Sequence, residues 1–146
     1  MAVCLLDVNV LVALFTADHS SHSAARVWFA ENAKRGWATC PVTQAGFVRI
    51  ASNPSARKHA VPPGEAVELL RANLMHPAHE FWRDDMNYVE AAEPFLPHLY
   101  GHQQVTDVYL LGLALRHKGR LVTFDQGPPA LAAAAGYREL AIRLRA

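Results

Sequence analysis

Two aspartates stand directly after apolar stretches that have the length of a β-strand. Asp7 follows Val-Cys-Leu-Leu, and Asp125 follows Leu-Val-Thr-Phe. In an open parallel sheet, ligands bind beyond the carboxyl ends of the strands, so we expect both carboxylates to face one crevice. A third aspartate, Asp107, follows Thr106 at the start of a leucine-rich segment. Thr106 is predicted to be the N-cap of a helix there, and the helix dipole favours a carboxylate in the first turn.

Carboxylates gathered in one pocket repel each other, and a bound divalent cation removes that conflict. Oxygen ligands favour hard ions, so Asp7, Asp107 and Asp125 are predicted to bind Mg²⁺ or Mn²⁺ in preference to zinc. Such an ion typically engages substrate phosphates, which points to phosphoester chemistry. A single aspartate after a strand is more often a turn residue or a helix cap, so the hypothesis depends on these residues acting as a set.

The elements that must position these side chains alternate between short apolar strands and helices. Strands are predicted at residues 1–6, 37–39, 80–83, 121–124 and 138–142. Helices are predicted at residues 8–15, 20–34, 43–52, 65–74, 89–99, 106–117 and 131–135. Residues 53–64 contain three prolines and are predicted to form a surface loop. The alternation indicates an α/β fold with a mostly parallel central sheet.

The composition suits one globular domain over residues 1–146. The chain is 51% hydrophobic, which allows a buried core, and its formal net charge of +1 excludes a global basic field for binding nucleic acid. The two cysteines, Cys4 and Cys40, make no disulfide framework. The N-terminus lacks the basic region of a signal peptide, and no apolar run has the length of a membrane span. We therefore expect a cytoplasmic protein without membrane contact.

Four stretches occur in order along nearly the whole chain. They are residues 7–11 (Asp-Val-Asn-Val-Leu), 46–50 (Gly-Phe-Val-Arg-Ile), 106–107 (Thr-Asp) and 121–125 (Leu-Val-Thr-Phe-Asp). Together they resemble a PIN-domain ribonuclease and, more narrowly, the VapC-type toxins of bacterial toxin–antitoxin modules. His22, Trp28 and residues 102–105 strengthen the match. No single motif is specific, whereas the ordered set is fairly specific.

The resemblance implies a three-layer α/β/α sandwich whose acidic cluster binds Mg²⁺ or Mn²⁺ and cuts transfer RNA or ribosomal RNA. It also implies a cognate antitoxin that inhibits the protein, and a homodimer. The family's metal-binding and catalytic aspartates fall on Asp7, Asp107 and Asp125. Its hydroxyl residue near the site falls on Thr123, and Asn9 belongs to the first motif. The implied mechanism is attack on the phosphodiester by water that the metal ion has acidified.

The sequence departs from the family pattern at one position. PIN nucleases usually carry a glutamate in the helix that precedes the Gly-Phe-Val-Arg stretch, and that position falls on Gln44. Glutamine keeps an oxygen ligand but lacks the negative charge, so we expect weaker metal binding. Arg49 lies five positions further on the same helix. It is predicted either to reach a substrate phosphate or to pair with a carboxylate of the site.

Two other functions compete with this interpretation. One is a PIN protein weakened by Gln44 that binds RNA or a partner without cutting. The other is a haloacid-dehalogenase-like phosphatase, which also begins with an aspartate after the first strand. That class needs a second aspartate where Asn9 stands, and a later paired-aspartate motif where Asp125 is followed by Gln-Gly. Metal-dependent RNA cleavage distinguishes the nuclease from both.

The eight histidines make no clear metal motif. His19 and His22 lie three positions apart, but no third ligand follows at a suitable spacing. We therefore predict surface or helix-end positions for them.

Overall fold

The structure of the protein is a computed structural model, and it describes residues 2–146. The strands in these residues are β1 (Cys4–Leu6), β2 (Trp37–Thr39), β3 (His79–Phe81), β4 (Arg120–Thr123) and β5 (Ala141–Arg143). The α-helices are α1 (Val8–Phe15), α2 (His22–Asn32), α3 (Pro41–Ala51), α4 (Pro63–Leu74), α5 (Tyr88–Ala92), α6 (Val105–Arg116) and α7 (Gly127–Ala134). The 3₁₀ turns are η1 (Ala33–Arg35), η2 (Glu93–His98), η3 (His102–Gln104) and η4 (Arg138–Leu140).

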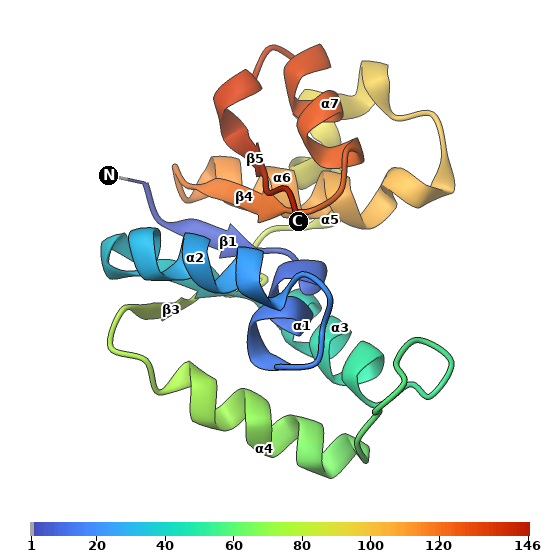
Figure 1. The fold of residues 1–146 in the computed structure, drawn as a ribbon. Helices are drawn as coiled ribbons and strands as arrows, with labels where there is room; N and C mark the ends of the chain where they lie inside the picture. The colour runs from blue at the N-terminus through green and yellow to red at the C-terminus, as the bar shows by residue number, and fades with distance from the viewer. Residues whose placement is uncertain (1) are drawn as a thin grey trace.

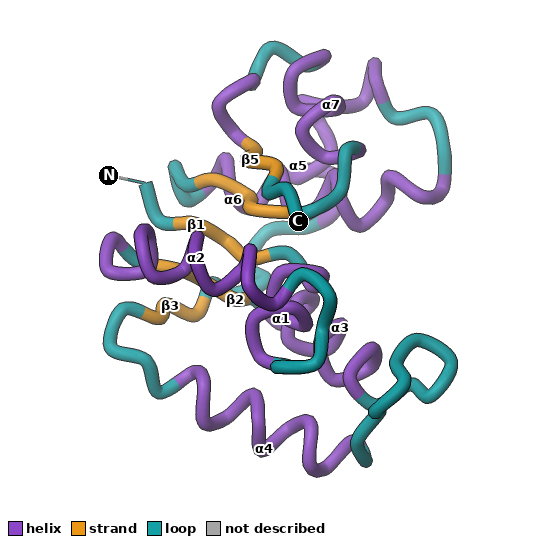
Figure 2. Tube along the Cα trace, in the orientation of Figure 1, coloured by secondary structure: helices purple, strands orange, loops and turns teal. Residues whose placement is uncertain are grey.

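The strands form one parallel sheet in the order β3-β2-β1-β4-β5. In the register, Leu5 of β1 lies beside Ala38 of β2 and Leu121 of β4. Figure 1 shows α1 to α4 on one side of the sheet and α5 to α7 on the other, and Figure 2 shows the short strands between these helices. The predicted three-layer α/β/α sandwich with a parallel sheet is confirmed.

The inner strands β1, β2 and β4 are buried because both faces of the sheet are covered there. Leu5 packs into the core beneath α5, α6 and α7, whereas its neighbours Cys4 and Leu6 pack into the core beneath α1 to α4. Leu121 and Val122 of β4 divide between the two cores in the same way. Successive side chains of a strand point to opposite faces, so a continuous apolar run is what a doubly covered strand requires.

Besides shifts in where several helices and strands begin and end, two predicted elements differ from the observed ones for local reasons. The helix predicted at residues 89–99 divides into α5 and the 3₁₀ turn η2, which carries Pro94 in its first turn and Pro97 inside it. Proline lacks the N–H that continues an α-helix. The strand predicted at residues 138–142 begins with η4, and only Ala141–Arg143 pairs with β4.

The start of α6 also differs from the prediction. Thr106 is not the N-cap, because the 3₁₀ turn η3 runs directly into the helix and places Gln104 at the cap position. The Gln104 side-chain oxygen accepts hydrogen bonds from the backbone N–H groups of Tyr100 and Gly101. Asp107 nevertheless lies in the first turn of α6, as predicted. None of the helices in residues 2–146 is long and apolar enough to cross a membrane.

Candidate active site

Asp7 is held in place at the junction between β1 and α1. It is the N-cap of α1, and its Oδ1 accepts a hydrogen bond of 2.8 Å from the backbone N–H of Val8. Its Oδ2 accepts a hydrogen bond of 2.7 Å from the hydroxyl of Thr123 at the end of β4. Only 7% of Asp7 is exposed. The carboxylate therefore has a fixed orientation at the carboxyl edge of the two central strands.

Thr123 links three residues of the site through one hydroxyl. Besides donating to Asp7, its Oγ1 accepts from the Asn9 side-chain amide at 3.2 Å and from the backbone N–H of Asp125 at 3.1 Å. Asn9 in turn accepts through Oδ1 from the backbone N–H of Phe124 at 3.1 Å. The spacings Asp-x-Asn and Thr-x-Asp in the sequence therefore correspond to one hydrogen-bonded network.

The three predicted carboxylates line a common cleft of about 300 Å³, which we call the acidic cleft. Its walls include Asp7, Asn9, His19, Ile50, Asp107 and Asp125. Asp107 comes from the first turn of α6, and Gly127 at the start of α7 lies beside it: a Cβ at Gly127 would be 3.5 Å from Asp107 Oδ2. The parallel pairing of β1 with β4, together with the helix starts at this edge, thus brings together residues that lie far apart in the sequence.

Burial and mutual repulsion disfavour the charged forms of the aspartates in the acidic cleft. Burial, followed by the charges of Asp7 and Asp125, raises the pKa of Asp107 to about 6. Burial also raises the pKa of Asp7, although the hydrogen bonds from Thr123 and Val8 act in the opposite direction. Both shifts have the causes expected for carboxylates that share a partly buried site. A bound cation would stabilise the charged forms of both groups.

His19 also lines the acidic cleft, a position that no sequence motif indicates. Its Nδ1 accepts a hydrogen bond of 3.0 Å from the backbone N–H of Ser21, so the neutral ring carries its proton on Nε2. Burial and the nearby charge of Arg57 lower its pKa. His22, by contrast, lies at a helix end as predicted: it is the first residue of α2, and its Nδ1 contacts the carbonyl of Ala13 in α1.

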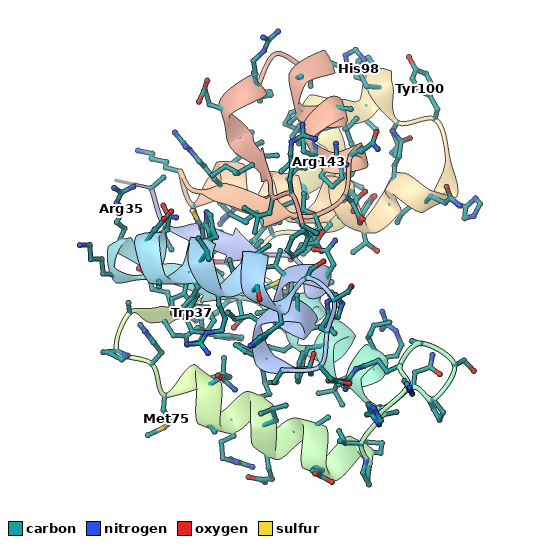
Figure 3. All side chains as sticks on the ribbon, in the orientation of Figure 1. Arg35, Trp37, Met75, His98, Tyr100 and Arg143 are labelled. Carbon is teal, nitrogen blue, oxygen red and sulfur yellow. The ribbon has the colours of Figure 1, made fainter. Side chains whose placement is uncertain are left out.

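Gln44 and Arg49 are not among the residues that line the acidic cleft. The Gln44 side chain on α3 donates from Nε2 to the hydroxyl of Thr39 at 3.0 Å, and that hydroxyl also contacts His79 Nε2 at 2.8 Å. Arg49 is exposed on the same helix. Another cation approaches the site from β5: Arg143, labelled in Figure 3, donates from Nε to the carbonyl of Phe124 at 3.4 Å.

The donor set of the acidic cleft fits a hard divalent ion. Asp7, Asp107 and Asp125 offer carboxylate oxygens and no sulfur. In residues 2–146, no group of three or more acidic, histidine or cysteine side chains is placed so that it could hold a metal ion by itself. Mg²⁺ commonly binds through one or two carboxylates, water and substrate phosphate, so an open arrangement of this kind suits it.

This fold and this acidic edge are those of a known class. The PIN domain family model matches residues 4–134, and the chain belongs to the PIN domain family. Membership rules against the haloacid-dehalogenase-like alternative, and it confirms the resemblance found in the sequence.

Within this family the chain is similar to several ribonucleases of Mycobacterium tuberculosis. It is 46% identical to Ribonuclease VapC38 over 125 residues, which cover 86% of each chain. It is 44% identical to Ribonuclease VapC39 over 121 residues, which cover 83% of this chain and 87% of that protein. Identity to Ribonuclease VapC44 is 43% over 122 residues, with coverage of 84% and 85%. In each comparison, the similarity extends over most of this chain and most of the VapC ribonuclease.

Proposed function

We propose that the protein is an endoribonuclease that uses Mg²⁺ or Mn²⁺ to hydrolyse structured RNA. The observation that carries the proposal is the convergence of Asp7, Asp107 and Asp125 on one cleft at the carboxyl edge of the sheet. The names of the relatives, which are ribonucleases, support RNA as the substrate class. We further propose transfer RNA or ribosomal RNA as the target.

The protein's own residues have distinct tasks in this mechanism. The divalent ion would be held by Asp7, Asp107 and Asp125. The hydroxyl of Thr123, which Asn9 also contacts, fixes the positions of the Asp7 carboxylate and the Asp125 backbone. When bound, the ion supplies positive charge for the scissile phosphate and acidifies a water molecule. This mechanism needs no histidine as general base.

His19 has a role that follows from its tautomer. With Nδ1 occupied by Ser21, its Nε2–H is a neutral donor at the wall of the cleft, and it is suited to a phosphate oxygen of the substrate. A positioning role of this kind predicts that His19→Ala raises KM for RNA more than it lowers kcat.

The proposal includes partners and a location. A cognate antitoxin would inhibit the enzyme, and two copies would form a homodimer in the cytoplasm. These statements follow from the likeness to VapC-type proteins. Co-expression with the product of a neighbouring small reading frame, followed by size-exclusion chromatography with light scattering, tests both the complex and the number of copies.

The test of the enzymatic proposal is cleavage of a mixture of transfer RNA and ribosomal RNA by the purified chain in Mg²⁺, in Mn²⁺ and in EDTA. Asp7→Asn is the inactive variant of choice, because asparagine still caps a helix and separates loss of charge from loss of fold. Glu93→Gln is its control, since it changes an exposed carboxylate outside the acidic cleft. We expect discrete fragments from the wild type and the control, only with metal, and none from Asp7→Asn.

Two results would contradict the proposal in different ways. Cleavage that persists in EDTA or in Asp7→Asn rejects the assigned site. RNA that is bound but never cut, with any metal, supports the non-catalytic alternative. In that case Gln44→Glu tests whether the missing charge is the reason.

A further inference from the structure

A second cavity lies on the same edge of the sheet as the acidic cleft. It has a volume of about 360 Å³, and its walls include Val42, Asp84, Met86, Tyr88, Thr106 and Tyr109. We call it the tyrosine pocket. Val42 lies just after β2, Asp84 lies after β3, and Thr106 is the neighbour of Asp107 in the first turn of α6. The tyrosine pocket therefore continues the row of strand ends on which the acidic cleft is built.

Two aromatic rings of the tyrosine pocket are nearly parallel and are held by their hydroxyl groups. The rings of Tyr88 and Tyr109 are inclined by 13°, with centroids 6.3 Å apart. Tyr88 donates its hydroxyl hydrogen to the carbonyl of Val105 at 2.7 Å, and Tyr109 donates to Asp84. Tyr88 is nonetheless 38% exposed. The pocket thus offers a preformed aromatic surface that a flat ligand can reach.

Asp84 is the charged residue among those that line the tyrosine pocket. Its neighbours Asp85 and Glu90 lie 3.5 Å and 3.8 Å from the guanidinium of Arg116, whereas Asp84 is held through Oδ1 by Tyr109. Burial and the hydrogen bond to Asp84 raise the pKa of Tyr109, so the phenol stays a donor. This arrangement leaves Asp84 Oδ2, and the second lone pair of Oδ1, as acceptors for N–H groups from outside.

We propose that the tyrosine pocket binds a nucleobase of the RNA beside the phosphate at the acidic cleft, and that it prefers guanine. Aromatic surfaces stack with every base, so the exposed ring of Tyr88, backed by the buried ring of Tyr109, supplies affinity without selection. Asp84 supplies the selection, because the N1–H and N2–H₂ groups of guanine can donate together to one carboxylate, whereas uracil offers only N3–H. The negative charge of Asp84 also disfavours phosphate in the pocket. This inference rests on the proposed function for the identity of the ligand.

The experiment is a titration of the wild-type chain with guanosine, adenosine, cytidine and uridine, followed through the backbone amide resonances of Met86 and Thr106. Nucleosides carry no phosphate, so their binding needs neither the metal nor cleavage. We expect guanosine to bind with a Kd on the order of millimolar, as suits one small, weakly held ligand. Uridine should bind roughly tenfold more weakly.

Four variants separate stacking, selection and background. Tyr88→Leu removes the ring and should weaken guanosine binding roughly tenfold, whereas Tyr88→Phe keeps the ring and should bind within about twofold of wild type. Asp84→Asn still accepts from Tyr109 but should bring guanosine and uridine to similar affinities. The matched control is Tyr100→Leu: Tyr100 is 84% exposed and points away from the body of the protein in Figure 3.

Three results would overturn the inference. They are equal binding of all four nucleosides, unchanged guanosine binding in Tyr88→Leu and Asp84→Asn, and an equal loss in Tyr100→Leu. Analytical ultracentrifugation of the same variants tests whether this surface instead mediates contacts between copies of the chain. A variant that loses the dimer but still binds guanosine assigns the surface to such contacts and rejects the base site. The nucleoside titration does not depend on RNA cleavage. A failure of the ribonuclease proposal can therefore be distinguished from a failure of the base-site proposal.

Discussion

Replacing Asp107 with asparagine should make the metal-free protein more stable. Burial and the charges of Asp7 and Asp125 raise the pKa of Asp107 from its ordinary value of 3.8 to about 6, so its charged form opposes folding. A shift of that size corresponds to about 3 kcal/mol for a fully buried group. Asp107 is only half-buried, and solvent screens its interactions, so we expect Asp107→Asn to gain about 1.5 kcal/mol. In a chain of this length, that gain raises Tm by about 3–6 °C.

The sign of the effect with pH follows from the same shift. Well below the ordinary pKa of 3.8, Asp107 is protonated in both the folded and the unfolded chain, so wild type and Asp107→Asn should have equal stability. Between pH 4 and pH 6 the folded chain holds the proton more tightly, so the wild type loses stability relative to the variant as the pH rises. Above pH 7 the difference should be complete and constant.

The assay is thermal unfolding in EDTA from pH 4 to pH 8, followed by circular dichroism, with Glu93→Gln as the control for loss of an exposed carboxylate. Addition of Mn²⁺ at pH 8 should reverse the ranking, because the wild type gains stability from the bound ion and the variant has lost a ligand. A variant that is less stable than wild type in EDTA at pH 8, or a difference that does not change with pH, would refute the reasoning.

Three further predictions concern the hydrogen-bond network of the site, the packing of the core and the binding of metal. Thr123→Val should lower the free energy of unfolding by about 2–4 kcal/mol in urea titrations, because Asp7 loses a buried donor and the Asp125 amide loses its acceptor. Thr123→Ser keeps the hydroxyl and should retain RNA cleavage. Gly112→Ala should cost about 2–3 kcal/mol in the same assay, since the added Cβ would lie 2.4 Å from the carbonyl oxygen of Ala91; an unchanged urea midpoint would contradict the close packing of α5 on α6. Stabilisation of the wild type by Mn²⁺ should weaken as the pH falls from 8 to 5, because protons compete for carboxylates whose pKa values are raised; calorimetric titration at the two pH values measures it.

The centre of the fold was predictable because β1 and β4 are apolar on both faces and are followed closely by aspartates. Asp7 and Asp125 were placed correctly on the carboxyl edge for that reason, and Asp107 was found from its position at the start of a leucine-rich segment. The wrong cap at Thr106 had a local cause. A 3₁₀ turn joins directly to α6, and threonine at that point resembles a cap in sequence alone.

The residues that sequence reasoning missed are those placed by tertiary contacts. His19 reaches the acidic cleft because the turn between α1 and α2 folds over it, and its spacing to His22 carries no such signal. The side chain of Gln44 bonds to Thr39 of β2, a contact that depends on how α3 begins after that strand. The tyrosine pocket joins residues after β2, after β3 and in α6, and no local motif links those segments.

The hydrogen bond between Thr123 and Asp7 joins residues 116 positions apart, and this has a consequence during translation. Chains leave the ribosome from the N-terminus onward, so Asp7 emerges early and must wait for β4 before its carboxylate is oriented. A nascent chain that ends before residue 120 lacks Thr123 and Asp125 and cannot complete the site. If RNA of the translation apparatus is the target, the ribosome that synthesises this protein is therefore spared until the chain is nearly finished.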